Sequence, residues 1–303
     1  RRPRRRTVPR DRRSRVQSIA AISINTFREV VRQPVFILVL ALAAAVLLLM
    51  MVVPLFGFAD EVVLFKDLAL HTSALAIVFL VALTAASSVA EELESKTVLA
   101  LLAKPVARWQ LLVGKFAGIV LALAAATAVL ALLVFLTTYV KVYNGAMPAE
   151  RHGAFSMSQS APVLEFQAKM WNHAASTLPA CVMILYRGAI LAAVAVVLSA
   201  GFSRVLAVIV TFGLYLVGHL TEFLTDAVRH STALVRDTVT PAAHLLPFLQ
   251  NFDIVNQVSA AMADEPAFEG LWAYTGWVGL YTVGYVAFVL LVGTFLFNRR
   301  EID

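Results

Sequence analysis

The sequence predicts an all-α integral membrane protein with six transmembrane helices preceded by an amphipathic interfacial elbow helix. Three observations lead to this fold class: 60% of the 303 residues are hydrophobic, only 15% are charged, and the mean hydropathy is +0.80. A soluble chain of this length needs more charge to cover its surface. Several stretches of about 20 residues carry almost no charge, and a helix of that length crosses the hydrocarbon core of a bilayer.

Residues 1–15 form a basic tail in which nine arginines stand against the single acidic residue Asp11. No aromatic or groove-reading element accompanies these arginines, so nucleic acid is not the expected partner. We expect a cytoplasmic tail that lies near the anionic headgroups of the lipid bilayer.

The pattern of residues 16–33 predicts the elbow helix, which we expect to lie in the plane of the lipid headgroups. On a helical wheel, apolar residues gather on one side and polar residues on the other. The two groups are Ala20, Ile24, Phe27 and Val31 against Asn25, Arg28, Glu29 and Arg32. Pro34 then turns the chain into the bilayer. An irregular linker over the same residues is the alternative interpretation.

Residues 34–303 predict the transmembrane domain, with boundaries good to about four residues. The expected spans are 35–58, 68–90, 111–138, 179–200, 204–224 and 272–297. Six spans place both termini on one side of the membrane, and Lys and Arg are about threefold more numerous on that side. We therefore expect a multi-pass protein of the cytoplasmic membrane with both termini cytoplasmic.

Two of the outer connections are long. The connection at 139–178 predicts an irregular loop with one short helix near 163–174. The connection at 225–271 contains a better-patterned segment from Leu245 to Met262. We expect this segment to form an amphipathic helix on or in the outer leaflet, because its apolar residues follow helical spacing. These residues are Leu249, Phe252, Val255 and Val258.

Residues for catalysis, nucleotide binding or metal binding do not form a recognisable pattern. No phosphate-binding loop occurs, because Gly114–Lys115 lacks both the upstream glycine and the following hydroxyl residue. His, Cys and carboxylate residues show no spacing typical of a metal site. The single cysteine, Cys181, lies in a predicted span. We therefore predict no catalytic residue, cofactor or metal in this chain.

Arg187 lies about seven residues inside the fourth predicted span. A charge near the centre of a span costs a few kcal/mol unless it is paired or hydrated. Two interpretations stay open. Arg187 extends to the outer headgroups, or it lines a polar substrate path together with His219 or Glu222 from the end of the fifth span.

A charged segment between the second and third predicted spans is the main indicator of function. Glu92 and Lys96 are four residues apart, in the order that stabilises a helix. Pro105 ends that helix, and Arg108 stands where the chain re-enters the membrane. A charged helix and turn held against the membrane indicates a docking element for a soluble partner. A solvated loop is the alternative.

The motif in this segment consists of Glu92, Glu94, Thr97, Leu101, Leu102, Pro105, Val106, Arg108, Leu111, Leu112, Gly114 and Lys115. It resembles the signature of ABC transporter permeases of the type-2 (ABC-2) export family. Residues 25–29, 247–253 and 297–302 resemble the elbow helix, the outer segment before the last span and the cytoplasmic end of that family. Lys96 departs from the pattern, because many members carry glycine there.

The resemblance implies a permease subunit that pairs with a second permease subunit and docks a separate ATP-binding-cassette ATPase, which binds ATP and Mg. The 91–110 loop would couple the two proteins through Glu92, Glu94, Thr97, Leu101, Pro105, Arg108, Gly114 and Lys115, and Phe27, Arg28 and Arg32 would belong to the elbow helix. The expected function is export of a substrate that the sequence does not identify. The alternative is a non-transporting membrane anchor, or a maturation or scaffold subunit of an ATPase complex.

Overall fold

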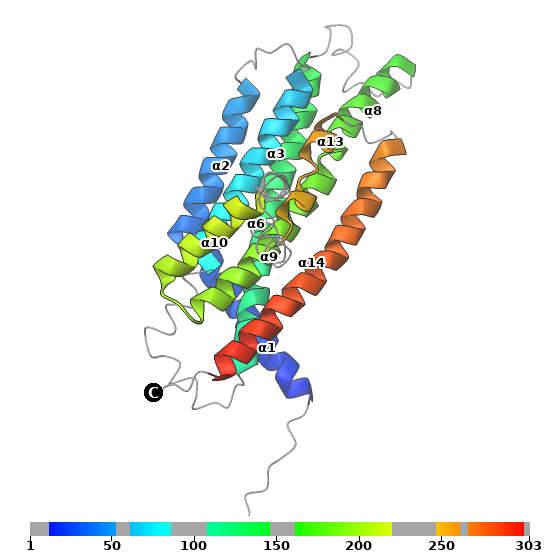
Figure 1. Cartoon of the computed structure of the whole chain (residues 1–303). Coiled ribbons are helices and arrows are strands. Elements are labelled where there is room, and N and C mark those ends of the chain that lie inside the picture. Colours follow the sequence, from blue (N-terminus) through cyan, green and yellow to red (C-terminus); the bar gives the residue numbers. More distant parts are fainter. Residues whose placement is uncertain are drawn as a thin grey trace, which may run out of the picture.

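The computed structural model describes residues 12–52, 61–85, 108–145, 161–219, 247–260 and 266–299. Figure 1 shows that the long helices form one elongated bundle. In chain order the elements are α1 (Arg12–Val31), α2 (Pro34–Val52), α3 (Glu61–Leu80), the π-helical turn η1 (Val81–Ala85), α6 (Arg108–Gly145), α8 (Ala161–Ala175), α9 (Leu178–Ser199), α10 (Arg204–His219), the 3₁₀ helix η2 (Leu249–Phe252), α13 (Val255–Ala260) and α14 (Pro266–Arg299).

The described residues contain five helices that are long and apolar enough to cross a membrane. They are Pro34–Val52, Glu61–Thr84, Trp109–Gly145, Pro162–Ser199 and Gly270–Leu296, and each contains most of one predicted span. The remaining predicted span, 204–224, corresponds to α10. Its 16 described residues cover only about 24 Å, less than the roughly 30 Å of a hydrocarbon core. The all-helical membrane fold is confirmed, and the sixth crossing stays a prediction.

Helix α9 lies at the centre of the bundle. Fifteen of its 22 residues are buried, against three of the 19 residues of α2. The run from Ala189 to Ala193 is buried, and its small side chains let neighbouring helices approach closely. The outer faces of α2 and α14 carry exposed apolar side chains such as Leu38 and Leu291, as expected for surfaces that face lipid.

Helix α1 packs on the first turns of α6 through two glycines. A Cβ atom on Gly118 would lie 2.5 Å from the carbonyl oxygen of Ser23 and 2.7 Å from Cβ of Thr26. A Cβ atom on Gly114 would lie 2.8 Å from Cγ2 of Ile22. Glycines one turn apart allow this close approach of two helices. The buried Ser23 hydroxyl keeps a hydrogen-bond partner, because it donates to the Ile19 carbonyl at 2.9 Å.

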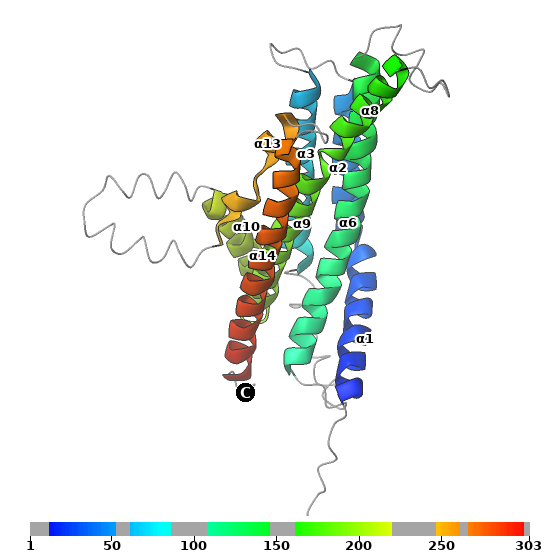
Figure 2. The same cartoon turned by 90° about the vertical axis from the view of Figure 1, so that its right-hand side faces the viewer.

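Helix α1 covers the residues for which the elbow helix was predicted, but its contacts differ from those expected. The buried face contains Ser23, Thr26 and Val30, whereas Ile24 of the predicted apolar stripe is 50% exposed. Small polar residues are buried because only they fit against the glycines of α6. Figure 2 shows that α1 runs alongside the lower end of α6. Its placement in the headgroup plane stays a prediction.

The connection at 139–178 contains more helix than predicted. Helix α6 continues to Gly145, and α8 includes the short helix expected near 163–174. Phe166 and Met170 of α8 pack against Val142 of α6 in a small separate core. The 38 residues of α6 give a length of about 57 Å, which exceeds the roughly 30 Å hydrocarbon core. Residues 146–160 lie outside the described residues.

The segment predicted as one helix from Leu245 to Met262 is divided into η2 and α13. The helical structure is interrupted at Asp253, whose carboxylate accepts a hydrogen bond from the Val255 amide at 3.3 Å. Asp side chains favour helix starts over helix interiors for this reason. Leu249 and Val258 are fully buried, so the segment packs in the protein core. The prediction of one continuous helix was therefore wrong, and the position of the segment relative to the outer leaflet stays a prediction.

We predict that Gly118→Val loosens α1 from α6 and destabilises the protein by roughly 1–3 kcal/mol, because the side chain overfills the contact. Cys181 is the single cysteine and is buried, so its reaction with a thiol-specific dye during heating reports unfolding. The matched control is Gly276→Val, since a Cβ atom at Gly276 meets nothing within 4 Å. Equal unfolding temperatures for the two variants would contradict the proposed packing.

Candidate functional site

Most of the predicted ATPase-coupling residues lie outside the described residues: Glu92, Glu94, Thr97, Leu101 and Pro105. Arg108 is the first residue of α6. Gly114 faces Ile22 of α1, and the nearby Lys115 is only 1% exposed. The structure thus places these last two residues in a packed part of α6, where Gly114 has a role in helix contact. Of the predicted elbow residues, Phe27 is partly buried, and Arg28 and Arg32 are exposed.

A second group of predicted residues comes together about half-way along α9. Arg187 lies nine residues after Leu178 and twelve before Ser199, so it is about 14 Å and 18 Å from the two ends of the helix. Its side chain is buried. The guanidinium carbon lies 5.7 Å from the centre of the Tyr215 ring. Arg187 therefore packs inside the protein and does not extend to the headgroups.

The buried charge of Arg187 has electrostatic partners on two other elements. The carboxylate of Asp253, after η2, attracts this charge, whereas His219, at the end of α10, is repelled by it when the imidazole is protonated. A buried cation requires such compensation, because lipid and apolar side chains cannot replace its hydration. The face of the Tyr215 ring adds a cation–π contact. These contacts hold η2 and α10 against the central helix.

Helix α10 ends against η2 at this place. The carbonyl oxygen of His219 accepts a hydrogen bond from Nε2 of Gln250 at 3.1 Å, and the His219 ring stacks on Tyr215 with 5.8 Å between centroids. Nε2 of His219 lies 3.8 Å from Oδ2 of Asp253. The end of an apolar helix thus meets a polar turn inside the bundle. Glu222, the third residue expected near Arg187, lies outside the described residues.

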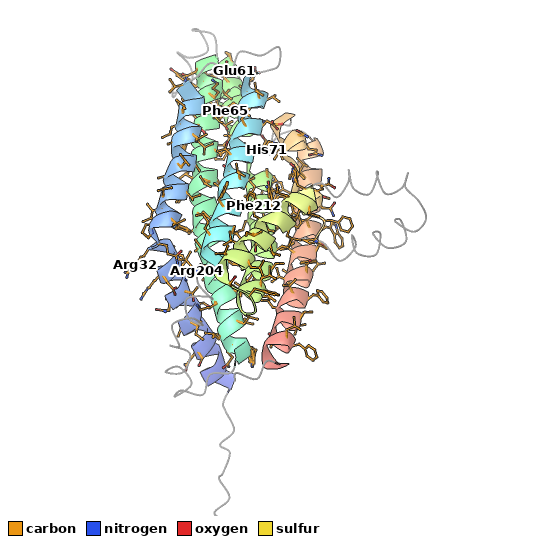
Figure 3. All side chains as sticks on the ribbon, turned by 60° about the vertical axis from the view of Figure 1, so that its left-hand side comes forward. Arg32, Glu61, Phe65, His71, Arg204 and Phe212 are labelled. Carbon is orange, nitrogen blue, oxygen red and sulfur yellow. The ribbon has the colours of Figure 1, made fainter. Side chains whose placement is uncertain are left out.

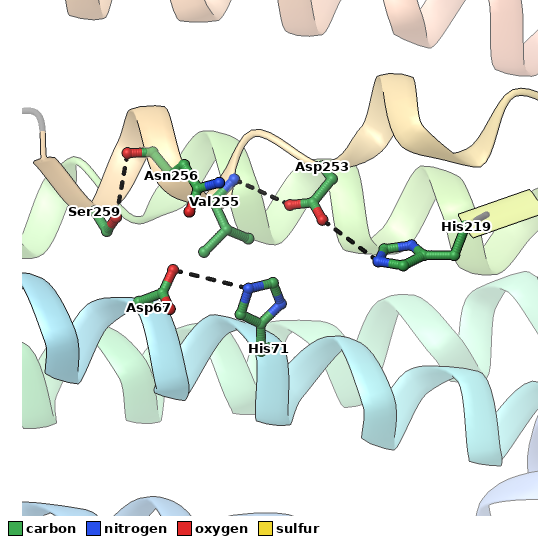
Figure 4. Close-up of polar contacts among 7 residues, drawn as sticks. All are labelled: Asp67, His71, His219, Asp253, Val255, Asn256 and Ser259. Atoms are coloured by element: carbon green, nitrogen blue, oxygen red, sulfur yellow. Dashed lines mark hydrogen bonds and ion pairs between the residues drawn. The ribbon is translucent and has the colours of Figure 1, made fainter. Parts of the chain in front are cut away.

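Two further polar residues, Asp67 and His71, face this region from α3. Figure 4 shows them opposite the segment that carries Asp253, Asn256 and Ser259. Nε2 of His71 lies 3.8 Å from Oδ1 of Asp67, and His71 interacts electrostatically with His219.

The sequence analysis missed Asp67, His71 and Asp253. Asp67 and His71 are four residues apart at the start of a predicted span. Polar residues with that spacing in an apolar helix indicate a functional or paired position. No comparable signal was available for Asp253, because its partners come from elements distant in the sequence.

Lys66 of α3 is fully buried and lies five residues after Glu61 in the same helix. Its ammonium group donates to Oγ of Ser176 at 3.0 Å and to the carbonyl oxygen of Val258 at 3.2 Å. Ser176 lies between α8 and α9, and Val258 lies in α13. One cation therefore joins three elements. Nearby, Lys141 of α6 forms an ion pair with Glu61 at 2.7 Å.

In the part of the chain that the structure describes, no group of three His, Cys, Asp or Glu residues could hold a metal ion. An all-helical bundle with long apolar helices defines a multi-pass membrane protein.

A family model described as "ABC-2 family transporter protein" matches residues 20–302. The chain belongs to this family. It is a membrane-spanning permease subunit of an ABC transporter, and such permeases lack the nucleotide-binding domain, so ATP is hydrolysed by a partner. A comparison with curated proteins gave no match.

We predict that Arg187→Leu destabilises the protein by roughly 3 kcal/mol, because it leaves Asp253 without its buried cation. The double variant Arg187→Leu with Asp253→Asn should recover part of this loss, since the unpaired charge is removed. Thiol labelling of Cys181 during heating measures both effects. Strictly additive destabilisation by the two substitutions would contradict the pairing.

Proposed function

We propose that the chain is the permease of an exporter, driven by an ATP-binding-cassette ATPase that docks on the 91–110 loop at the cytoplasmic face. The match of the family model over residues 20–302 carries this proposal, because it includes the entire loop and its Glu92–Arg108 motif. ATP and Mg would bind to the ATPase and not to this chain. Glu92, Glu94 and Thr97 would supply polar contacts to it.

The position of α6 supports transmission of ATPase movement through the bundle. Its first residue, Arg108, lies in the last part of the 91–110 loop. Helix α6 contacts α1, α2, α3, α8 and α9, so a shift of its inner end displaces most of the described helices. Closure of two ATPase subunits on ATP would select one of two bundle arrangements, and ATP hydrolysis would release it.

The orientation and pairing of the chain follow from the same proposal. We infer cytoplasmic termini and pairing with a second permease subunit, identical or different. Figure 3 shows Arg32 and Arg204 at one level of the bundle and Glu61 near its opposite end. Arginines at the inner border agree with the excess of Lys and Arg counted on that side.

The polar cluster around Arg187 favours transport over a purely anchoring role. An anchor needs only an apolar surface and a docking loop. Arg187, His219 and Asp253 instead place charged and polar groups about half-way across the described bundle. Intramembrane polar residues are costly and typically mark substrate or ion pathways. We propose that Arg187, His219 and Glu222 belong to the substrate path, with Arg187 as a buried charge behind its wall and not as a group that contacts the substrate.

The double charge reversal Glu92→Lys with Arg108→Glu should strongly reduce ATPase activity that depends on the permease. It should leave membrane insertion intact, because both positions lie outside the predicted spans. The assay compares ATP hydrolysis by the co-expressed complex in nanodiscs. The matched control is Glu150→Lys with Arg151→Glu, the same reversal in the predicted outer connection. Normal coupling in the first variant would contradict docking on this loop.

Cysteine labelling on intact cells tests the orientation. In a Cys181→Ser background, we expect the Arg151→Cys variant to react with a membrane-impermeant maleimide. The Thr97→Cys variant should react only after the cells are permeabilised, because the 91–110 loop faces the cytoplasm. Labelling of the Thr97→Cys variant from outside would overturn both the orientation and the docking proposal.

A further inference from the structure

Five polar residues of α3, α10 and the η2–α13 segment form a surface that we call the acceptor face: Asp67, His71, His219, Asp253 and Asn256 (Figure 4). Their side chains are accessible. Exposed fractions are 29% for Asp67 and 46% for His71, and 25% for Asp253 and 41% for His219. Asn256 is exposed as well.

The charges next to the acceptor face are arranged with a clear asymmetry. The neighbouring cations point into the protein, where Lys66 is 0% and Arg187 4% exposed. Lys66 is engaged by Ser176 and Val258, and Arg187 packs on Tyr215. The carboxylates and imidazoles are left on the accessible side. A ligand at this surface therefore meets hydrogen-bond acceptors and negative charge, while the cations are covered.

The acceptor face lies within membrane-spanning helices. Asp67 and His71 are six and ten residues after Glu61, so they lie about 9 Å and 15 Å along α3 from its outer end. Hydrocarbon chains offer no hydrogen bonds to such groups. Among the described residues, Oδ1 of Asp67 and Nδ1 of His219 have no hydrogen-bond partner. Both atoms are buried, so a ligand at the acceptor face would contact the accessible parts of the Asp67 and His219 side chains and not these two atoms.

Apolar and aromatic side chains border the acceptor face along the membrane. On α3, Leu75 is 45% and Phe79 40% exposed, and on α10, Leu216 is 48% exposed. Phe79 also contacts the ring of Phe212, with centroids 5.6 Å apart. A ligand that fits both parts carries a positively charged hydrogen-bond donor joined to an apolar body.

We propose that the acceptor face binds the ammonium group of an amphiphilic organic cation, with its apolar part along Leu75, Phe79 and Leu216. The inference rests on the proposed export function and names the substrate class. Asp67 supplies the main charge contact, because Asp253 already accepts a hydrogen bond from the Val255 amide and its charge is partly balanced by the attraction of Arg187. Charge-assisted hydrogen bonds are the strongest polar contacts available to such a ligand.

The test measures binding of a fluorescent probe to the full chain in phosphatidylcholine nanodiscs, without any ATPase. The probe is dansylcadaverine, a primary ammonium on an apolar dye, and its neutral comparison is the N-acetyl derivative. Empty nanodiscs correct for partition into lipid. We expect the ammonium form to bind at least about tenfold more tightly than the acetylated form, the size of one charge-assisted hydrogen bond.

Three variants assign the binding to the acceptor face. Asp67→Asn should remove the preference for the ammonium probe, and Asn256→Lys should do the same by placing a cation beside Asp67. Asn256→Asp should increase the affinity for the ammonium probe, a gain that misfolding cannot produce. Glu165→Gln is the matched control, because Glu165 is an exposed acid on α8, away from the acceptor face, and should bind as the parent chain does.

Equal binding of the charged and neutral probes would overturn the proposal, as would parent-like selectivity in both Asp67→Asn and Asn256→Lys. Phosphatidylethanolamine, which carries an ammonium headgroup, is added to the nanodiscs in a second arm. Competition by this lipid but not by free alkylamines would identify a lipid as the source of the ammonium group. A failure of ATPase docking on the 91–110 loop leaves this binding result unchanged, so the two proposals fail separately.

Discussion

The compensation of buried cations in an apolar bundle determines how the described helices are held together. Lys66 and Arg187 cannot be hydrated by lipid, so each needs acceptors from the protein. Lys66 finds them at Ser176 and in α13, whereas Arg187 packs on the face of the Tyr215 ring and is attracted by the carboxylate of Asp253. Both cations thereby fasten the η2–α13 segment to the central helices. The hydrogen bonds from Gln250 to the His219 carbonyl and from the Tyr274 hydroxyl to the Asn251 carbonyl also help to fix the position of this short, broken segment.

Close helix contact is the second constraint, and it uses residues without side-chain bulk. Gly118 accommodates α1, and Gly279 of α14 accommodates the hydroxyl of Tyr186, which would lie 2.9 Å from an added Cβ atom. In a membrane the hydrophobic effect does not drive helices together, so dense packing at such points supplies much of the attraction. The same packing joins the start of α6, at the end of the proposed docking loop, to the N-terminal helix.

Length and hydropathy were sufficient to predict the long helices, because a span of about 20 apolar residues has few alternatives in a membrane. The motif from Glu92 to Lys115 was sufficient to indicate the family. The break at Asp253 was not predictable, since the apolar spacing from Leu249 to Val258 is compatible with one continuous helix. The acceptor face was missed because its members come from three elements far apart in the chain, and only folding brings them together.

The length of α6 has a mechanical consequence. A stiff rod of about 57 Å that pivots near one end moves its far tip by roughly 10 Å when it tilts by about 10°. The tip of α6 is fixed to α3 by the Lys141–Glu61 ion pair and to α8 by Phe166 and Met170. A small displacement of α6 at Arg108 would therefore cause a large lateral displacement of the joined ends of α6, α3 and α8 at the opposite face of the membrane.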